Sequence, residues 1–74
     1  MQGKKKFTKH EAARIKALLR EKANASRADQ KNIRVKIRNI GFYITDFDQS
    51  FSGFTLRDFE DLIKQKMIII VDGW

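Results

Sequence analysis

Residues 26–41 read SRADQKNIRVKIRNIG, and this stretch decides the fold that the sequence predicts. At about 3.6 residues per turn, Ile33, Ile37 and Ile40 fall on one side of a helix of about four turns. Four cations form a second stripe, about a third of a turn away from the isoleucines: Arg27, Lys31, Arg34 and Arg38. The stretch therefore predicts an amphipathic helix with one face toward a core and a neighbouring basic face.

Both ends of this helix carry recognisable signals. Ser26 and Asp29 have the spacing of a capping box, and Gly41 suits the left-handed position that follows many helices. A strand over residues 33–38 is the alternative, because apolar and basic residues alternate there. We favour the helix, since only the helix also accounts for Ile40, the basic stripe and the two end signals.

Another helix is predicted just before this one. Thr8 and Glu11 form a capping box, so the helix should begin near Thr8. Its apolar side comprises Ala12, Ile15, Leu18, Leu19 and Ala23. Its cations have the same rotational offset from the apolar side as those of the later helix: Lys9, Lys16 and Arg20. No Pro or Gly interrupts residues 8–40, so one continuous helix is possible, but we favour a break at Asn24–Ser26.

Whether the two basic stripes form one surface depends on how the helices pack. In an antiparallel pair on a common layer, the stripes either point to opposite flanks or face each other across the seam. The handedness of the pair decides between these arrangements, and the sequence does not give it. The later helix alone is therefore the safer prediction for a basic surface.

The chain changes character after Gly41, where aromatic residues become frequent: Phe42, Tyr43, Phe47, Phe51 and Phe54. Residues 42–47 are predicted as a short strand and residues 48–53 as a loop. A third helix should begin at Thr55, because Thr55 and Asp58 form a capping box. The β-branched run over residues 67–71 predicts a buried strand.

These elements give the order α-α-β-α-β. The predicted fold class is α+β and mostly helical, with an αα-hairpin packed on a small β-α-β unit. The 74 residues suffice for one small domain, placed at residues 8–74, and residues 1–7 are predicted to be a flexible basic arm. Tyr43 and Phe51 are expected to be the more exposed aromatics. The core is predicted to include the other large rings: Phe42, Phe47, Phe54 and Phe59.

Composition excludes several classes of protein. The chain has no cysteine and a single histidine, His10, which leaves neither a disulfide nor the usual zinc ligands. It contains no phosphate-binding loop, dinucleotide fingerprint or nucleophile motif, so we expect no enzyme, no metal and no other cofactor. The longest apolar run, residues 67–71, is too short to span a bilayer, and there is no secretory signal. We therefore expect a cytoplasmic protein.

Charge is distributed unevenly, and this favours a polyanionic partner. Residues 1–40 contain 13 Lys and Arg against three acids, whereas residues 41–74 contain three against six, and the net charge is +7. The sequence thus predicts a non-catalytic nucleic-acid-binding module for DNA or RNA. The main phosphate contacts would be Arg27, Lys31, Arg34 and Arg38. Secondary contacts would come from Lys9, Lys16, Arg20 and Lys4–Lys6.

Two further interpretations stay open at this point. The turn at residues 23–26 has the length found in helix-turn-helix proteins, although it lacks the frequent glycine. The other interpretation is a small protein-interaction or homo-oligomerisation module with an acidic protein partner. In that case the apolar run over residues 67–71 would pair edge to edge in a homodimer, with Trp74 as an anchor.

Overall fold

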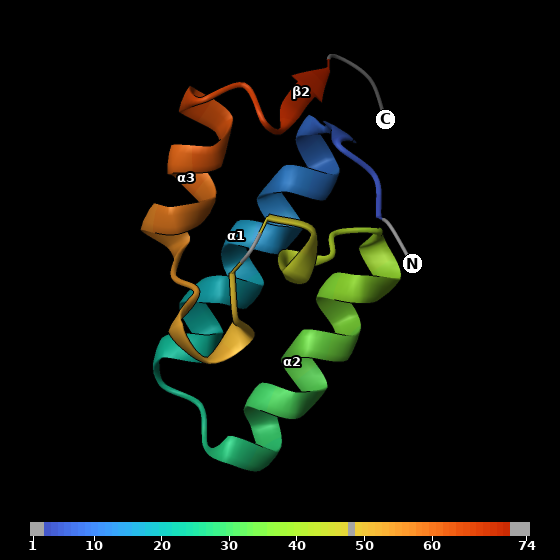
Figure 1. Cartoon of the computed structure of the whole chain (residues 1–74). Coiled ribbons are helices and arrows are strands. Elements are labelled where there is room, and N and C mark those ends of the chain that lie inside the picture. Colours follow the sequence, from blue (N-terminus) through green and yellow to red (C-terminus); the bar gives the residue numbers. More distant parts are fainter. Residues whose placement is uncertain (1–2, 48, 72–74) are drawn as a thin grey trace.

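A computed structural model of the chain describes residues 3–47 and 49–71. Three helices, two short strands and two 3-10 turns follow one another in these bounds: β1 (Lys6–Thr8), α1 (Lys9–Ala23), α2 (Arg27–Ile40), η1 (Ile44–Phe47), η2 (Phe51–Gly53), α3 (Leu56–Lys64) and β2 (Ile69–Val71). Helices α1 and α2 lie side by side and run roughly antiparallel, with α3 on the other side of α1 (Figure 1). The predicted class, α+β and mostly helical, is confirmed.

The helices begin and end where the sequence signals place them. Thr8 Oγ1 accepts the Glu11 N–H, and the Glu11 carboxylate accepts the Thr8 N–H, which completes the predicted capping box of α1. Helix α3 has the same device at Thr55 and Asp58. Helix α2 ends at Gly41, whose φ of 112° lies in the left-handed region. The predicted helix over residues 27–40 is therefore confirmed, and the alternative strand over residues 33–38 is wrong.

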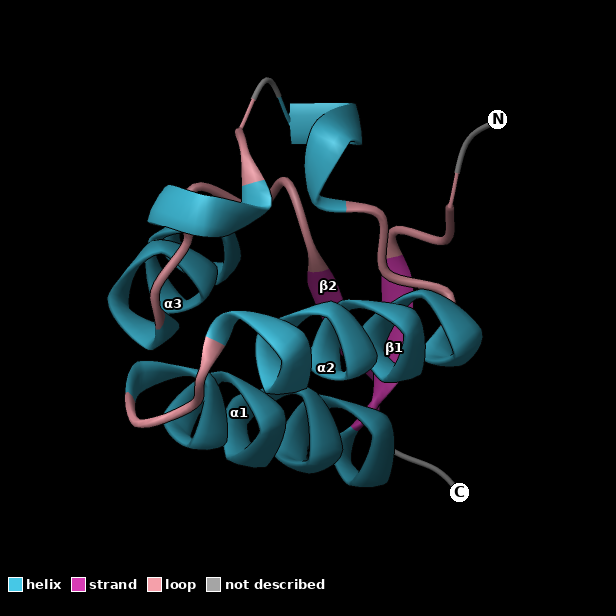
Figure 2. Cartoon of the chain, turned by 90° about the horizontal axis from the view of Figure 1, so that it is seen from below, coloured by secondary structure: helices cyan, strands magenta, loops and turns pink. Residues whose placement is uncertain are grey.

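The break between α1 and α2 is also confirmed, because α1 ends at Ala23 and α2 begins at Arg27. The helix-turn-helix interpretation is wrong, since such motifs cross their two helices at a steep angle, whereas α1 and α2 run nearly antiparallel (Figure 1). Figure 2 shows the two helices on one side of the molecule and the segment with the 3-10 turns on the other.

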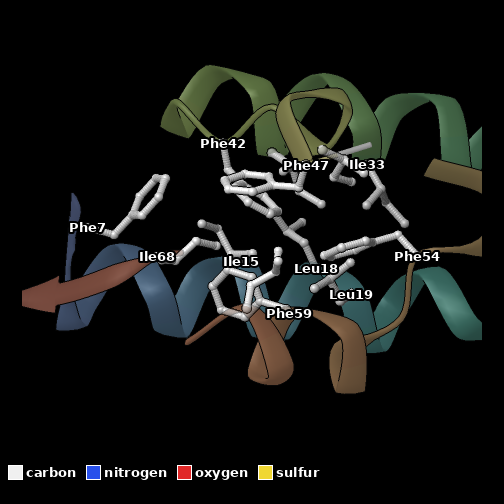
Figure 3. Packing of buried hydrophobic residues seen from close by; sticks show 13 residues of the cluster. Phe7, Ile15, Leu18, Leu19, Ile33, Phe42, Phe47, Phe54, Phe59 and Ile68 are labelled. Carbon is white, nitrogen blue, oxygen red and sulfur yellow. The ribbon is translucent and has the colours of Figure 1, made fainter. Parts of the chain in front are cut away.

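The core is built mainly from phenylalanine rings. Phe42 is fully buried at its centre, with ring centroids 5.3 to 5.9 Å from those of four neighbours (Figure 3): Phe7, Phe47, Phe54 and Phe59. Ile15, Ile37 and Ile68 are as fully buried as Phe7, Phe42, Phe54 and Phe59, whereas Phe47 keeps 7% of its surface exposed. The four aromatics predicted for the core are all buried, and so is Phe7, which the sequence predicts to lie in the flexible arm.

One strand lies elsewhere in the chain than the sequence predicts. Residues 44–47 form a 3-10 turn, because Phe42, Ile44 and Phe47 are all buried and this spacing does not fit the two faces of a strand. The partner of β2 is instead β1, which pairs with it in parallel, with Lys6 opposite Ile69 and Thr8 opposite Val71.

Residues 3–7, the described part of the predicted flexible arm, are bound to the rest of the domain. The Lys4 N–H donates to the Gly41 carbonyl at 2.8 Å, and the Gly3 N–H donates to the Asp46 carboxylate at 2.7 Å. Phe7 is only 1% exposed, so its ring is part of the core. Burial of this ring holds the charged residues next to it in the chain against the domain. Because residues 4–6 are all lysines, the sequence does not mark Phe7 as a core residue.

Candidate functional site

The cations predicted as the main contacts all lie on the surface of α2. Burial of Ile33 and Ile37 fixes the rotation of this helix and turns the stripe of Arg27, Lys31, Arg34 and Arg38 toward solvent. Within residues 3–47 and 49–71, none of these four side chains forms an ion pair. The guanidinium of Arg38 lies over the ring of Tyr43, 5.4 Å from its centroid. The stripe therefore presents four positive charges that no described carboxylate neutralises.

Arg20, one of the three cations of α1, has different neighbours from the cations of α2. Lys9 and Arg20 are exposed and Lys16 is half-buried. Arg20 lines a hollow with Thr55, Leu56 and Arg57 at the start of α3. The hollow between α1 and α2 is lined by other residues: Glu21, Asn24, Ala25, Asp29, Asn32, Ile33 and Lys36. Arg20 of the α1 stripe therefore lies beside α3, in a different hollow from the one that Arg34 and Arg38 of the α2 stripe line.

The stripe of α2 borders a groove of about 410 Å³, which we call the α2–η groove. Arg34 and Arg38 lie along it on the α2 side. Thr45, Ser50 and Ser52 supply hydroxyl groups on the side of the 3-10 turns. The remaining lining is apolar: Ile37, Phe42, Ile44 and Phe51. The groove therefore combines guanidinium and hydroxyl donors with an apolar and aromatic wall.

Lys22 is a structural residue of this region that the sequence interpretation missed. It is 7% exposed, and its Nζ donates to the carbonyl oxygens of Phe54 at 2.9 Å and of Ser52 at 3.3 Å. The ammonium also lies 4.9 Å from the centroid of the Phe51 ring. Burial lowers the pKa of Lys22, and the negative charge of Asp58 acts in the opposite direction. Lys22 therefore ties α1 to the segment that forms one wall of the α2–η groove.

A signal for Lys22 was present in the sequence. Lys22 follows Leu18 by four residues and Leu19 by three, which places it on the apolar side of α1. A lysine in this phase either extends its stem over the core or is buried with partners. Only the fold shows that the carbonyl oxygens of the η2 segment are within its reach.

Three large apolar side chains on or next to β2 are exposed. Met67, Ile69 and Val71 are 43%, 45% and 37% exposed, whereas Ile68 between them is buried. The sequence predicts a buried strand here, but the small sheet covers only one face of it. The correction follows from the alternation of side chains along a strand. Trp74, the predicted anchor of a homodimer, lies outside the described residues.

The described part of the chain, residues 3–47 and 49–71, contains no group of three or more His, Cys, Asp or Glu side chains that could hold a metal ion. No helix there is long and apolar enough to cross a membrane. Comparisons with protein-family models, curated proteins and solved structures found no match. The surface of the molecule is therefore the basis on which a function can be assigned.

Proposed function

We propose that the protein is a non-catalytic nucleic-acid-binding module that contacts phosphates through Arg27, Lys31, Arg34 and Arg38. The observation that carries this proposal is that all four cations are exposed on one helix face and lack ion pairs within the described residues. A surface helix usually places acids near such cations. Without them the stripe produces a positive field that attracts a polyanion and releases its counterions on binding.

The other basic residues support this proposal in a secondary role. Arg20 lines a hollow beside α3 and not the one that Arg34 and Arg38 line, so we expect Lys9, Lys16 and Arg20 to add long-range attraction rather than to contact the same segment of nucleic acid. Lys4 is paired with Glu11 at 2.6 Å, which leaves Lys5 and Lys6 as the more available cations of the arm.

The proposal is tested by a salt titration of binding. Fluorescence anisotropy would follow labelled duplex DNA, single-stranded DNA and RNA between about 50 and 200 mM salt. The stripe variant changes Arg27, Lys31, Arg34 and Arg38 to glutamine. The control variant removes the same amount of charge at exposed positions elsewhere: Arg14, Lys36, Arg57 and Lys64.

If all four stripe residues neutralise phosphates, they contribute about −3.6 to the salt slope of the wild type on duplex DNA and about −2.8 on a single strand. The stripe variant should then lose about three to four units of slope, and the control variant should keep most of its affinity. Circular dichroism would show that both variants stay folded. Absence of binding at about 50 mM salt, or equal losses in the two variants, would contradict the proposal. Binding to an acidic protein alone would assign the stripe to a different partner.

A second candidate function is homo-oligomerisation through β2. The observation that favours it is the exposed row of Met67, Ile69 and Val71 beside a sheet of only two short strands. Such a sheet is marginal on its own and leaves strand edges unpaired. A second copy of the same chain would cover the row across a twofold axis, because identical apolar rows are self-complementary.

Gel filtration and analytical ultracentrifugation distinguish this candidate from the first. A concentration-dependent dimer that Ile69→Lys abolishes and Arg34→Glu preserves would support assembly through β2. A monomer at all accessible concentrations would exclude it and would leave the nucleic-acid proposal unaffected.

A further inference from the structure

The α2–η groove has a composition that phosphate binding alone does not require. Arg34 and Arg38 would suffice to hold a phosphate at its edge. Behind them, however, the groove is lined by apolar side chains, and its hydroxyl groups come from the opposite wall. A ligand that uses all of these features needs an anionic part, a flat apolar part and polar edges. A nucleotide has these three parts.

The size and the walls of the groove fit one nucleotide. Small-ligand sites measure about 300–1,000 Å³, and the groove, at about 410 Å³, lies near the lower limit. Phe51 forms part of its wall, and aromatic side chains are the platforms on which unpaired bases stack. Thr45, Ser50 and Ser52 can exchange hydrogen bonds with the edge of a base, since a hydroxyl both donates and accepts.

The aromatic wall is held in place before any ligand arrives. Lys22 bonds to the carbonyl oxygens of Ser52 and Phe54, and its ammonium lies over the Phe51 ring. The Ser50 and Ser52 hydroxyl oxygens are 3.4 Å apart and share a hydrogen bond. Arg38 is likewise supported by the ring of Tyr43. A preorganised wall lowers the cost of ordering side chains on binding.

We propose that the α2–η groove is a subsite for one unpaired base of single-stranded nucleic acid, with the adjoining phosphates on Arg34 and Arg38. This inference rests on the proposed function and adds a preference for single strands. A paired base stays within the duplex stack and cannot enter a groove of this kind, whereas an unpaired base can turn out and stack on Phe51. The nucleic-acid strand would continue from the groove along the exposed cations of α2 toward Arg27.

The test compares ligands that differ only in their bases. A short oligothymidylate, an oligomer of equal length with abasic sites, and a duplex of equal length would be titrated by anisotropy at one salt concentration. The variant Phe51→Leu removes the aromatic face and keeps apolar bulk, and Phe51→Trp restores an aromatic face. We expect Phe51→Leu to weaken oligothymidylate binding by about 5- to 100-fold and Phe51→Trp to retain it. Binding of the abasic oligomer should change little in either variant.

The outcomes separate this inference from the proposed function. If the stripe variant loses salt-dependent binding but duplex and single strand bind equally and Phe51→Leu has no effect, the subsite is wrong and the phosphate contacts stand. If no nucleic acid binds, both the subsite and the proposed function are wrong. Should Phe51→Leu unfold, Phe51→Trp in a Trp74→Phe background gives an independent readout. Its fluorescence should be quenched by oligothymidylate and not by the abasic oligomer, and equal responses would overturn the subsite.

Discussion

Replacing Lys22 by methionine tests how the structure holds the wall that carries Phe51 and Ser52. Lys22 is 7% exposed, and its Nζ bonds to the carbonyl oxygens of Phe54 and Ser52 at 2.9 and 3.3 Å. Methionine keeps an unbranched apolar stem and removes the charged donor. The two carbonyl groups then lose their partner, while the cost of burying an ammonium group disappears.

The stability lost with the two hydrogen bonds should exceed the stability gained by no longer burying an ammonium group. A hydrogen bond from a charged donor contributes about 1.5–3 kcal/mol, and the bond to Phe54 is short and buried. The longer bond to Ser52 is partly exposed, so water can replace it at lower cost. Because burial lowers the pKa of Lys22, removing the ammonium recovers part of the desolvation cost. We expect Lys22→Met to lower the free energy of unfolding by about 1–2 kcal/mol, which is about 5–15 °C in Tm for so small a domain.

Thermal unfolding followed by circular dichroism measures this difference directly. Lys36→Met is the matched control, because Lys36 is exposed on α2 and the change should stay within about 0.5 kcal/mol of wild type. A Lys22→Met protein as stable as the wild type, or more stable, would refute the reasoning. It would mean that the desolvation cost of the ammonium equals or exceeds the value of its two bonds.

Three other predictions concern the start of the chain and the helix ends. Gly41→Ala should lower the free energy of unfolding by about 1–2 kcal/mol in chemical denaturation, because Gly41 has a φ of 112°, and an unchanged midpoint would contradict this. Gly3→Ala should release the start of the chain, since the added Cβ would lie 2.4 Å from the Gly41 carbonyl oxygen. Faster hydrogen exchange at the Lys4 amide would show the release, and unchanged protection would argue against it. The Lys4 ammonium and a backbone N–H lower the pKa of Glu11 below 4.5, so this stabilisation is present above pH 4.5 and is lost as the pH falls through the folded-state pKa. Glu11→Gln should therefore flatten the acid limb of a plot of Tm against pH, and an identical limb would exclude the contribution.

Local signals predicted the helices well because each signal acts over a few residues. The boxes at Thr8 and Thr55 and the glycine at Gly41 place the helix ends where the structure has them. The cation stripe of α2 follows from helix geometry once its isoleucines face the core. Its exposure was therefore predictable, although a partner for it remains a prediction.

Features that depend on contacts distant in sequence were not predictable in the same way. Phe7 reads as part of a basic arm, and it becomes a core residue through partners distant in sequence: β2, which pairs with its strand, and the ring of Phe42. The α2–η groove needs α2 and two 3-10 turns to meet, and turns of four and three residues are too short to show a periodic pattern in the sequence. The side to which each stripe points depends on the handedness of the hairpin, which the residues of one helix do not encode.

The parallel pairing of β1 with β2 also determines when the molecule can finish folding. Lys6 lies opposite Ile69, so the first strand has no partner until almost the whole described chain has left the ribosome. Until then the ring of Phe7 lacks the cover of Ile68 and Ile70. The helical hairpin can form early because its contacts are local, whereas closing the sheet carries the entropic cost of a long loop. A chain that loses its last strand would therefore leave the ring of Phe7 partly uncovered, and this would expose an aromatic residue to the proteases and chaperones that recognise unfinished proteins.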